Sequence, residues 1–141
     1  MTADVAAANR MGRRWRDFSG FASAAPPAPA ARYLLSGWLL RIAGPAFPWG
    51  TLAVNVLGSF LLGLIMQVAL ATDLLSPTLR LALTTGLMGG FTTYSTFNYE
   101  TLKYLEQNDW LLGFANIAAT LLVCLAAGAV GVVSGRLLAG R

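Results

Sequence analysis

The stretch Gly86–Glu100, GLMGGFTTYSTFNYE, lies inside a long apolar segment that is predicted to be a membrane-spanning helix. It places two adjacent glycines, Gly89 and Gly90, shortly before Thr92 and Thr93. Glycine pairs followed by threonines favour an interruption of a helix. Within lipid, irregular backbone is tolerated only where it is buried in protein or lines a watery cavity. The interruption is therefore a candidate functional site.

An interrupted helix exposes carbonyl groups at the end of its first half and N–H groups at the start of its second half. The first end carries partial negative charge and the second carries partial positive charge. Carbonyls between Gly89 and Thr92 are therefore predicted to suit a bare cation, whereas the second half would favour an anion. No Lys or Arg lies between Leu81 and Leu102, so an anion would meet neutral donors, which favours rapid passage over tight binding.

The composition predicts an integral membrane protein, because 56% of the 141 residues are hydrophobic and only 11% are charged. The sequence contains no histidine and a single cysteine, Cys124. It therefore lacks the usual general base, and an internal disulfide is impossible. We find no set of residues that would make an enzyme, and no basic patch with interleaved aromatics that would bind nucleic acid.

Four apolar segments predict an all-α membrane protein with four transmembrane helices, the third broken in the middle of the membrane. The predicted helices span residues 30–47, 49–71, 78–105 and 110–138. The first is barely long enough to span a bilayer, whereas the second has more than 20 residues without a charge. Residues 1–29 are predicted to be a disordered tail rich in alanine, arginine and proline, and residues 30–141 form the membrane domain.

A bundle of four short helices encloses too little space for a pore, so we expect a homodimer. The loop charges give a weak orientation signal when the N-terminal tail and Arg32 are left aside. One side then carries three cations and the other carries two: Arg80, Arg136 and Arg141 against Arg41 and Lys103. This small difference is consistent with insertion in both orientations. Four further arginines in the tail raise the bias to seven against two and would favour one orientation.

Two motifs resemble those of a known family. Gly89–Phe97, GGFTTYSTF, closely resembles the signature of the small bacterial fluoride channels, the Fluc or CrcB family. Gly50–Gly58, GTLAVNVLG, is a second string similar to the family, and Arg32–Tyr33 resembles the end of its first-helix motif. The resemblance covers about Ala31 to the C-terminus. The chain departs from the family at Ser23–Ala31, SAAPPAPAA, where members usually have a glycine-rich apolar turn.

The resemblance implies an antiparallel homodimer of dual topology with two pores. It also implies a structural, non-transported sodium ion held by the backbone carbonyls of Gly89 and Thr92. The alternative interpretation of these two residues is a flexible kink that binds no ion.

The resemblance further assigns a fluoride pathway. Tyr94 and Phe97 match two phenylalanines whose ring edges line that pathway, although aromatics at this spacing can also serve packing alone. Asn55 would donate hydrogen bonds to fluoride, or would instead join two helices. Ser95 and Thr96 would likewise line the pathway, or would satisfy backbone carbonyls of their own helix.

Together these features predict a passive fluoride channel in the cytoplasmic membrane. Arg32 would attract anions into a vestibule, or would extend its charged group to the membrane surface. A small dual-topology coupled transporter, similar to a multidrug exporter, is the alternative. Such a transporter needs a membrane-buried carboxylate, and the first two predicted helices contain none. A purely structural subunit would leave the broken helix unexplained.

Overall fold

The structure is a computed structural model that describes residues 27–72 and 75–140. In these residues every regular element is helical, which confirms the all-α prediction. The elements are α2 (Pro27–Ala43), α3 (Trp49–Ala71), α4 (Pro77–Leu81), the π-helix η1 (Ala82–Met88), α5 (Gly89–Phe91), α6 (Tyr94–Glu106) and α7 (Trp110–Leu138). Because α4, η1 and α5 follow one another without a gap, they form one continuous helical rod.

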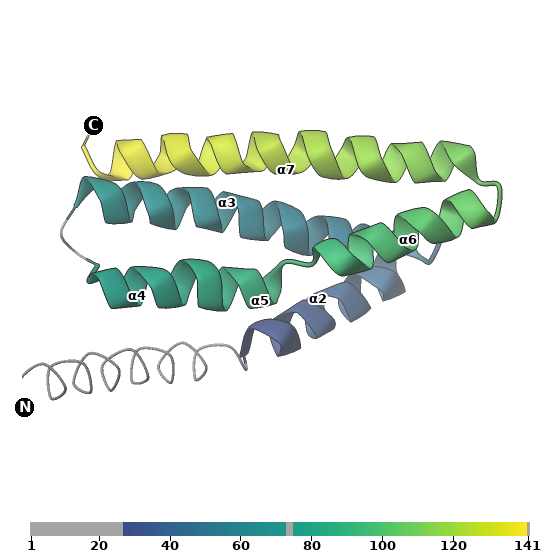
Figure 1. Cartoon of the computed structure of the whole chain (residues 1–141), viewed down its shortest axis with the longest axis horizontal. Helices are drawn as coiled ribbons and strands as arrows, with labels where there is room; N and C mark the ends of the chain where they lie inside the picture. The colour runs from purple at the N-terminus through teal and green to yellow at the C-terminus, as the bar shows by residue number, and fades with distance from the viewer. Residues whose placement is uncertain (1–26, 73–74, 141) are drawn as a thin grey trace, which may run out of the picture.

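The helices lie roughly along one direction (Figure 1). α3 and α7 run side by side in the same sense and make the most extensive helix–helix contact in the described chain. The rod α4–η1–α5 and then α6 run in the opposite sense. In Figure 1, α3 lies between the rod and α7. α2 crosses beneath α6 and contacts α3. The chain therefore folds up and down as four successive passes.

The second and fourth predicted helices have the bounds that the structure gives to α3 and α7. α3 has 23 residues and α7 has 29 residues, and each contains an 18-residue stretch of high mean hydropathy, 2.0 in α3 and 2.3 in α7. In the described part of the chain, these two helices are long and apolar enough to cross a membrane.

The first helix was predicted at residues 30–47, and those bounds are wrong. α2 begins at Pro27 and ends at Ala43. It stops there because Gly44 adopts a positive φ of 76°, donates its N–H to the Leu40 carbonyl at 3.1 Å, and is followed by a proline. α2 thus includes residues 27–29 of the segment predicted as a tail, whereas residues 1–26 lie outside the described part.

The third pass leaves the helical conformation at only two residues. Gly89, at φ −63° and ψ −33°, stays helical, so the interruption begins after the two glycines at which the sequence predicted it. Thr92 (φ −75°, ψ 157°) and Thr93 (φ −144°, ψ 107°) are extended, and α6 begins at Tyr94. The glycines remain helical because the Thr92 N–H still bonds the Met88 carbonyl, at 3.0 Å.

The π-helix η1 was not predicted from the sequence. Its seven residues, ALTTGLM, carry the wider hydrogen-bond pattern directly before the two extended threonines. π-Helical turns inside α-helices often occur at functional sites.

α3 and α7 approach until their backbones touch at glycines of α7. A Cβ atom built on Gly131 would overlap the Phe60 carbonyl oxygen. One built on Gly135 would lie 2.7 Å from the Cβ of Gln67. Small residues allow this close approach, which is characteristic of helix pairs in membranes.

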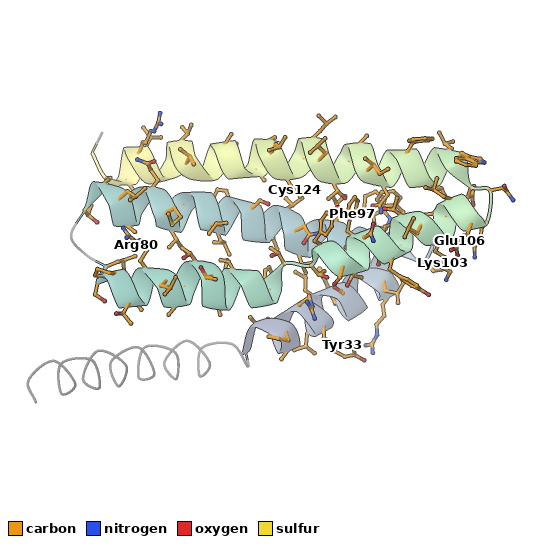
Figure 2. The ribbon with its side chains drawn as sticks, viewed as in Figure 1. Tyr33, Arg80, Phe97, Lys103, Glu106 and Cys124 are labelled. Carbon is orange, nitrogen blue, oxygen red and sulfur yellow. The ribbon has the colours of Figure 1, made fainter. Side chains whose placement is uncertain are left out.

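The protomer leaves much of its apolar surface uncovered. Val54 is fully buried, but Leu122 is 65% exposed and Leu125 is 64% exposed in the middle of α7. Several charged side chains lie toward the ends of the helices, with Arg80 at one end and Lys103 and Glu106 near the other (Figure 2). An uncovered apolar middle with charged ends is the pattern of a protein surrounded by lipid or by a second subunit.

Candidate functional site

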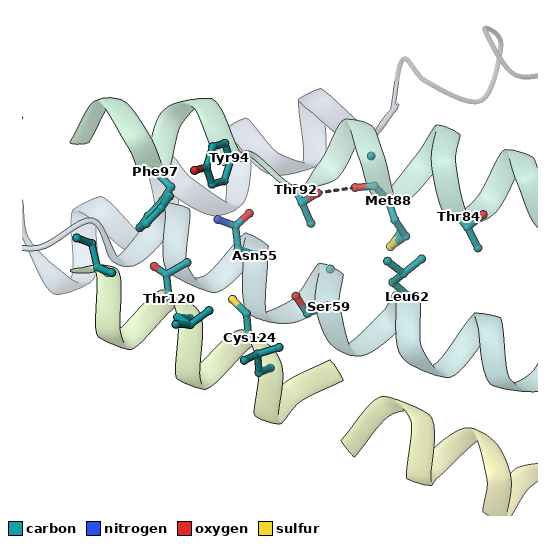
Figure 3. A pocket seen from close by; sticks show the side chains of 15 residues that line it. Asn55, Ser59, Leu62, Thr84, Met88, Thr92, Tyr94, Phe97, Thr120 and Cys124 are labelled. Atoms are coloured by element: carbon teal, nitrogen blue, oxygen red, sulfur yellow. Dashed lines mark hydrogen bonds between the residues drawn. The ribbon is translucent and has the colours of Figure 1, made fainter. Parts of the chain in front are cut away.

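An open groove of about 620 Å³ runs between α3, the third pass and α7 (Figure 3). It brings together five of the eight predicted site residues: Asn55, Gly89, Thr92, Tyr94 and Phe97. Ser59 from α3, together with Thr120 and Cys124 from α7, adds small polar groups to an otherwise apolar wall. The groove therefore combines the two candidate cation ligands with the two candidate pathway aromatics.

Thr92 closes the first half of the third pass. Its N–H and its hydroxyl both donate to the Met88 carbonyl, each at 3.0 Å (Figure 3). The hydrogen of this hydroxyl is thus engaged within its own turn, so the Thr92 side chain has no O–H left to donate to an anion. Gly89, one turn earlier, is exposed on the same groove.

The side-chain amide of Asn55 holds the second extended residue, Thr93, from the neighbouring helix. The Thr93 N–H donates to Asn55 Oδ1 at 2.8 Å, and Asn55 Nδ2 donates to the Thr93 carbonyl at 3.2 Å. Asn55 is 9% exposed and Thr93 is 6% exposed, so water competes little for these two bonds. The predicted interhelical role of Asn55 is therefore present, and its amide retains one further N–H.

Thr93 also caps α6. The Thr96 N–H donates to Thr93 Oγ1 at 3.2 Å, and Thr93 Oγ1 donates to Thr96 Oγ1 at 2.7 Å. This arrangement satisfies one of the free amides at a helix N-terminus. Ser95 and Thr96 are exposed but lie outside the groove lining. Thr93 was not among the predicted site residues, although its position before a helix start is a recognisable N-cap signal.

Tyr94 and Phe97 lie one turn apart at the start of α6. Their ring centroids are 5.7 Å apart and the ring planes are inclined by 50°. Tyr94 is 78% exposed, whereas Phe97 is half-buried. Both side chains project toward the space between α6, α3 and α7 (Figure 3). The edges of aromatic rings carry partial positive charge, which attracts anions.

A second layer of polar bonds fixes α6 beyond the groove. Thr51 Oγ1 donates to Glu100 Oε1 at 2.8 Å, which links α3 to α6. Asn116 Nδ2 donates to Thr101 Oγ1 at 2.9 Å, which links α7 to α6. The Tyr104 hydroxyl donates to the Ala46 carbonyl at 3.2 Å, in the loop before α3.

Three buried oxygens in this region have no hydrogen-bond partner within the described residues: Glu100 Oε2, Asn116 Oδ1 and Thr120 Oγ1. Unpaired buried oxygens in a membrane helix bundle mark places where water or a passing solute would be stabilised. Asn116 and Thr120 are four residues apart on α7 and so share one face of that helix.

Arg32 lies on α2, away from the groove. It is half-buried and is not part of the groove lining. Its predicted vestibule role stays a prediction.

Comparison with known proteins identifies the family. The family model "CrcB-like protein, Camphor Resistance (CrcB)" matches residues 21–132 and so begins inside the segment predicted as a tail. A protein of Sorangium cellulosum is 62% identical over 111 residues, which cover 78% of this chain and 87% of that protein. A Geobacter sulfurreducens protein is 54% identical over 106 residues, covering 75% and 86% respectively.

A protein of Anaeromyxobacter dehalogenans is 54% identical over 110 residues, which cover 78% of this chain and 87% of the relative. All three relatives are named "Fluoride-specific ion channel FluC". These names describe ion channels and not enzymes, in agreement with the expectation that the chain has no catalytic site. These matches show that the chain belongs to the CrcB family of ion channels.

Proposed function

We propose that this protein is a passive, fluoride-selective channel. The single observation that carries the proposal is the gathering of Asn55, Thr92, Tyr94 and Phe97 on one groove, in a chain whose relatives are named fluoride-specific channels. A small, strongly hydrated anion needs its water replaced by donors of similar strength. The free N–H of Asn55 and the ring edges would supply part of that set.

Ser95 and Thr96 would extend the pathway beyond the groove. Both are exposed in the single protomer, so they are available to a path that a second subunit completes. Because these donors are neutral, they would bind the anion weakly enough to release it. Their crowding would disfavour the larger chloride ion. Arg32 would raise the local concentration of anions at one mouth of the path.

We further propose that the carbonyls of Gly89 and Thr92 hold a structural sodium ion at the interruption. Neutral carbonyl oxygens suit a hard cation. Both residues line the same groove, and they stand at the carbonyl end of a helical rod, which carries partial negative charge. When bound, the ion would cross-link main-chain groups and would not itself be transported.

The groove needs a cover, and we propose that a second, antiparallel copy supplies it. In one protomer the groove is open and mostly apolar, and it leaves Tyr94 largely exposed. Two copies related by a twofold axis would bring four carbonyls to one ion, two from each subunit. Such a dimer would place the interruption in the middle of the membrane, where irregular backbone must be enclosed by protein.

In a cell the channel would lie in the cytoplasmic membrane and release fluoride outward. Hydrogen fluoride enters as the neutral acid and dissociates inside. The negative membrane potential then drives the anion out through a passive pore, which would reduce fluoride toxicity.

The coupled-transporter alternative has less support. α2 and α3 contain no Asp or Glu. α6 contains two carboxylates: Glu100, which accepts a hydrogen bond from Thr51, and Glu106, which is the last residue of the helix. Proton exchange would need a carboxylate that faces the transported solute.

Reconstitution into liposomes tests the proposed function. Vesicles loaded with potassium fluoride and treated with valinomycin should release fluoride to an ion-selective electrode when the protein is present. Vesicles loaded with chloride should release far less, and replacing sodium with N-methylglucamine throughout should abolish fluoride release. Equal fluoride and chloride fluxes would refute selectivity, and efflux driven only by a proton gradient would support the transporter.

A further inference from the structure

We infer that Asn55 and Thr93 are positioning residues that keep the carbonyls of Gly89 and Thr92 unpaired. They do so by binding the two backbone amides that a continuous helix would direct onto those carbonyls. The inference rests on the sodium site proposed above and deepens it, because it assigns the affinity of that site to two side chains that do not touch the ion.

The Gly89 carbonyl is kept free by Asn55. In an α-helix the N–H of residue i bonds the carbonyl of residue i−4, so the Thr93 N–H would close onto Gly89. Here that N–H donates to Asn55 Oδ1 at 2.8 Å instead. The bond from Asn55 Nδ2 to the Thr93 carbonyl, at 3.2 Å, fixes the amide plane in this position.

The Thr92 carbonyl is kept free by Thr93. In a continuous helix the Thr96 N–H would close onto Thr92. Here that N–H donates to Thr93 Oγ1 at 3.2 Å. The Thr93 hydroxyl in turn donates to Thr96 Oγ1 at 2.7 Å, which orients its lone pairs toward the Thr96 N–H.

The diversion begins at the first candidate ligand, Gly89. One residue earlier the ladder is regular, because the Thr92 N–H donates to the Met88 carbonyl at 3.0 Å. A carbonyl that accepts an amide hydrogen has fewer lone pairs to offer a cation. The side chains that remove the amides therefore determine how strongly Gly89 and Thr92 can bind sodium.

A nearby contact on α3 holds the same dipeptide. A Cβ atom built on Gly58 would overlap Cγ2 of Thr92. Asn55 and Gly58 are three residues apart and face the same way. The second sequence motif, residues 50–58, thus supplies the contacts that hold the two extended threonines of the first motif, residues 89–97.

Sodium-dependent thermal stability of the purified full-length protein tests the inference without relying on ion flux. The melting temperature, Tm, is measured in detergent at constant ionic strength while sodium replaces N-methylglucamine. A ligand that binds only the folded state raises Tm with its concentration, and the rise yields a dissociation constant. We expect Thr93→Val, which removes the oxygen that binds the Thr96 amide, to weaken sodium binding about tenfold, equivalent to ~1.4 kcal/mol.

Two further variants separate positioning from general destabilisation. Thr93→Ser keeps the oxygen and should bind sodium as the unmodified protein does. Thr72→Val is the matched control, because it removes a hydroxyl that donates to the Val68 carbonyl at 2.8 Å at the far end of α3. It should lower Tm at every sodium concentration and leave the sodium dissociation constant unchanged. If Thr93→Val does not fold, Thr93→Ala against Thr93→Ser makes the same comparison.

An unchanged sodium dissociation constant in Thr93→Val or Thr93→Ala would overturn the inference, and so would a weakening of equal size in Thr93→Ser. If the Tm of the unmodified protein does not respond to sodium, the proposed sodium site fails and the inference fails with it. Fluoride efflux from the same preparation then tells whether the channel function itself survives.

Discussion

The hydroxyl of Thr51 donates a 2.8 Å hydrogen bond to Oε1 of Glu100, which joins the start of α3 to the middle of α6. The second oxygen of this carboxylate is buried without a partner in the described chain. Thr51 is therefore the group that offsets the cost of holding Glu100 between two helices.

Replacing Thr51 with valine should destabilise the fold, because it leaves both oxygens of Glu100 without a donor. The expected loss is about 1–3 kcal/mol in the free energy of unfolding. Denaturation of the purified protein, followed by circular dichroism, measures it. Thr51→Ser keeps the donor and serves as the control. Equal losses in the two variants would show that the methyl group, and not the hydrogen bond, matters.

Replacing Gly131 with alanine should separate α3 from α7, because the new methyl group would overlap the Phe60 carbonyl oxygen. Overpacking of this kind costs about 1–3 kcal/mol. Gly128→Ala is the matched control on the same helix, since its Cβ would meet Ser59 O at an ordinary 3.7 Å. Thermal unfolding should show a lower Tm for Gly131→Ala alone. A similar Tm in both variants would contradict backbone contact at Gly131.

Replacing Tyr94 with phenylalanine should raise the rate of fluoride efflux. The phenol hydroxyl offers the anion an extra hydrogen bond that would detain it, and the ring edge remains in the variant. A neutral hydrogen bond worth about 0.5–1.5 kcal/mol corresponds to a change of roughly two- to tenfold in rate. Electrode recordings on liposomes measure it. Tyr94→Leu, which removes the ring, should reduce efflux. A rise in Tyr94→Leu would exclude a role for the ring.

Cys124 offers a direct test of the dimer, because it is the single cysteine of the chain and lines the groove. If a second copy covers the groove, a maleimide should label Cys124 much more slowly in the folded protein than in sodium dodecyl sulfate. A Cys124→Ser/Gln107→Cys variant places the thiol in the exposed turn before α7 and should label rapidly in both states. Rapid labelling of folded Cys124 would contradict the covered groove.

Local sequence signals predicted the long helices well. α3 and α7 are continuous apolar runs that begin directly after Pro48 and Asp109, so composition and length sufficed to place these helices. The first helix was misplaced by three to four residues at each end. Its C-terminus depends on the left-handed Gly44, and its N-terminus tolerates Pro27 in the first turn, where proline does not break a helix.

The candidate site was only partly predictable. Five of its residues come together as the motifs suggested, but the pairing of Asn55 with Thr93 depends on the register between α3 and the third pass. No spacing within one segment encodes that register. The two glycines pointed to an interruption, yet they remain helical, and the two threonines after them are extended. The first half of the third pass ends where side-chain oxygens of Asn55 and Thr93 bind the backbone amides of Thr93 and Thr96.

The anchoring of α6 has a mechanical consequence. Thr51, Tyr104 and Asn116 tie this helix to three other parts of the chain. The side-chain bonds of the preceding rod stay within one turn, as with Thr84 to Arg80 at 2.8 Å. α6 is thus held more rigidly than the rod α4–η1–α5. Thermal motion of the third pass should therefore be larger in the rod, before Thr92, than in α6. In hydrogen–deuterium exchange, the amides of α6 should exchange more slowly than those of the π-helix η1. Slower exchange in η1 would show that the rod is the more rigid segment.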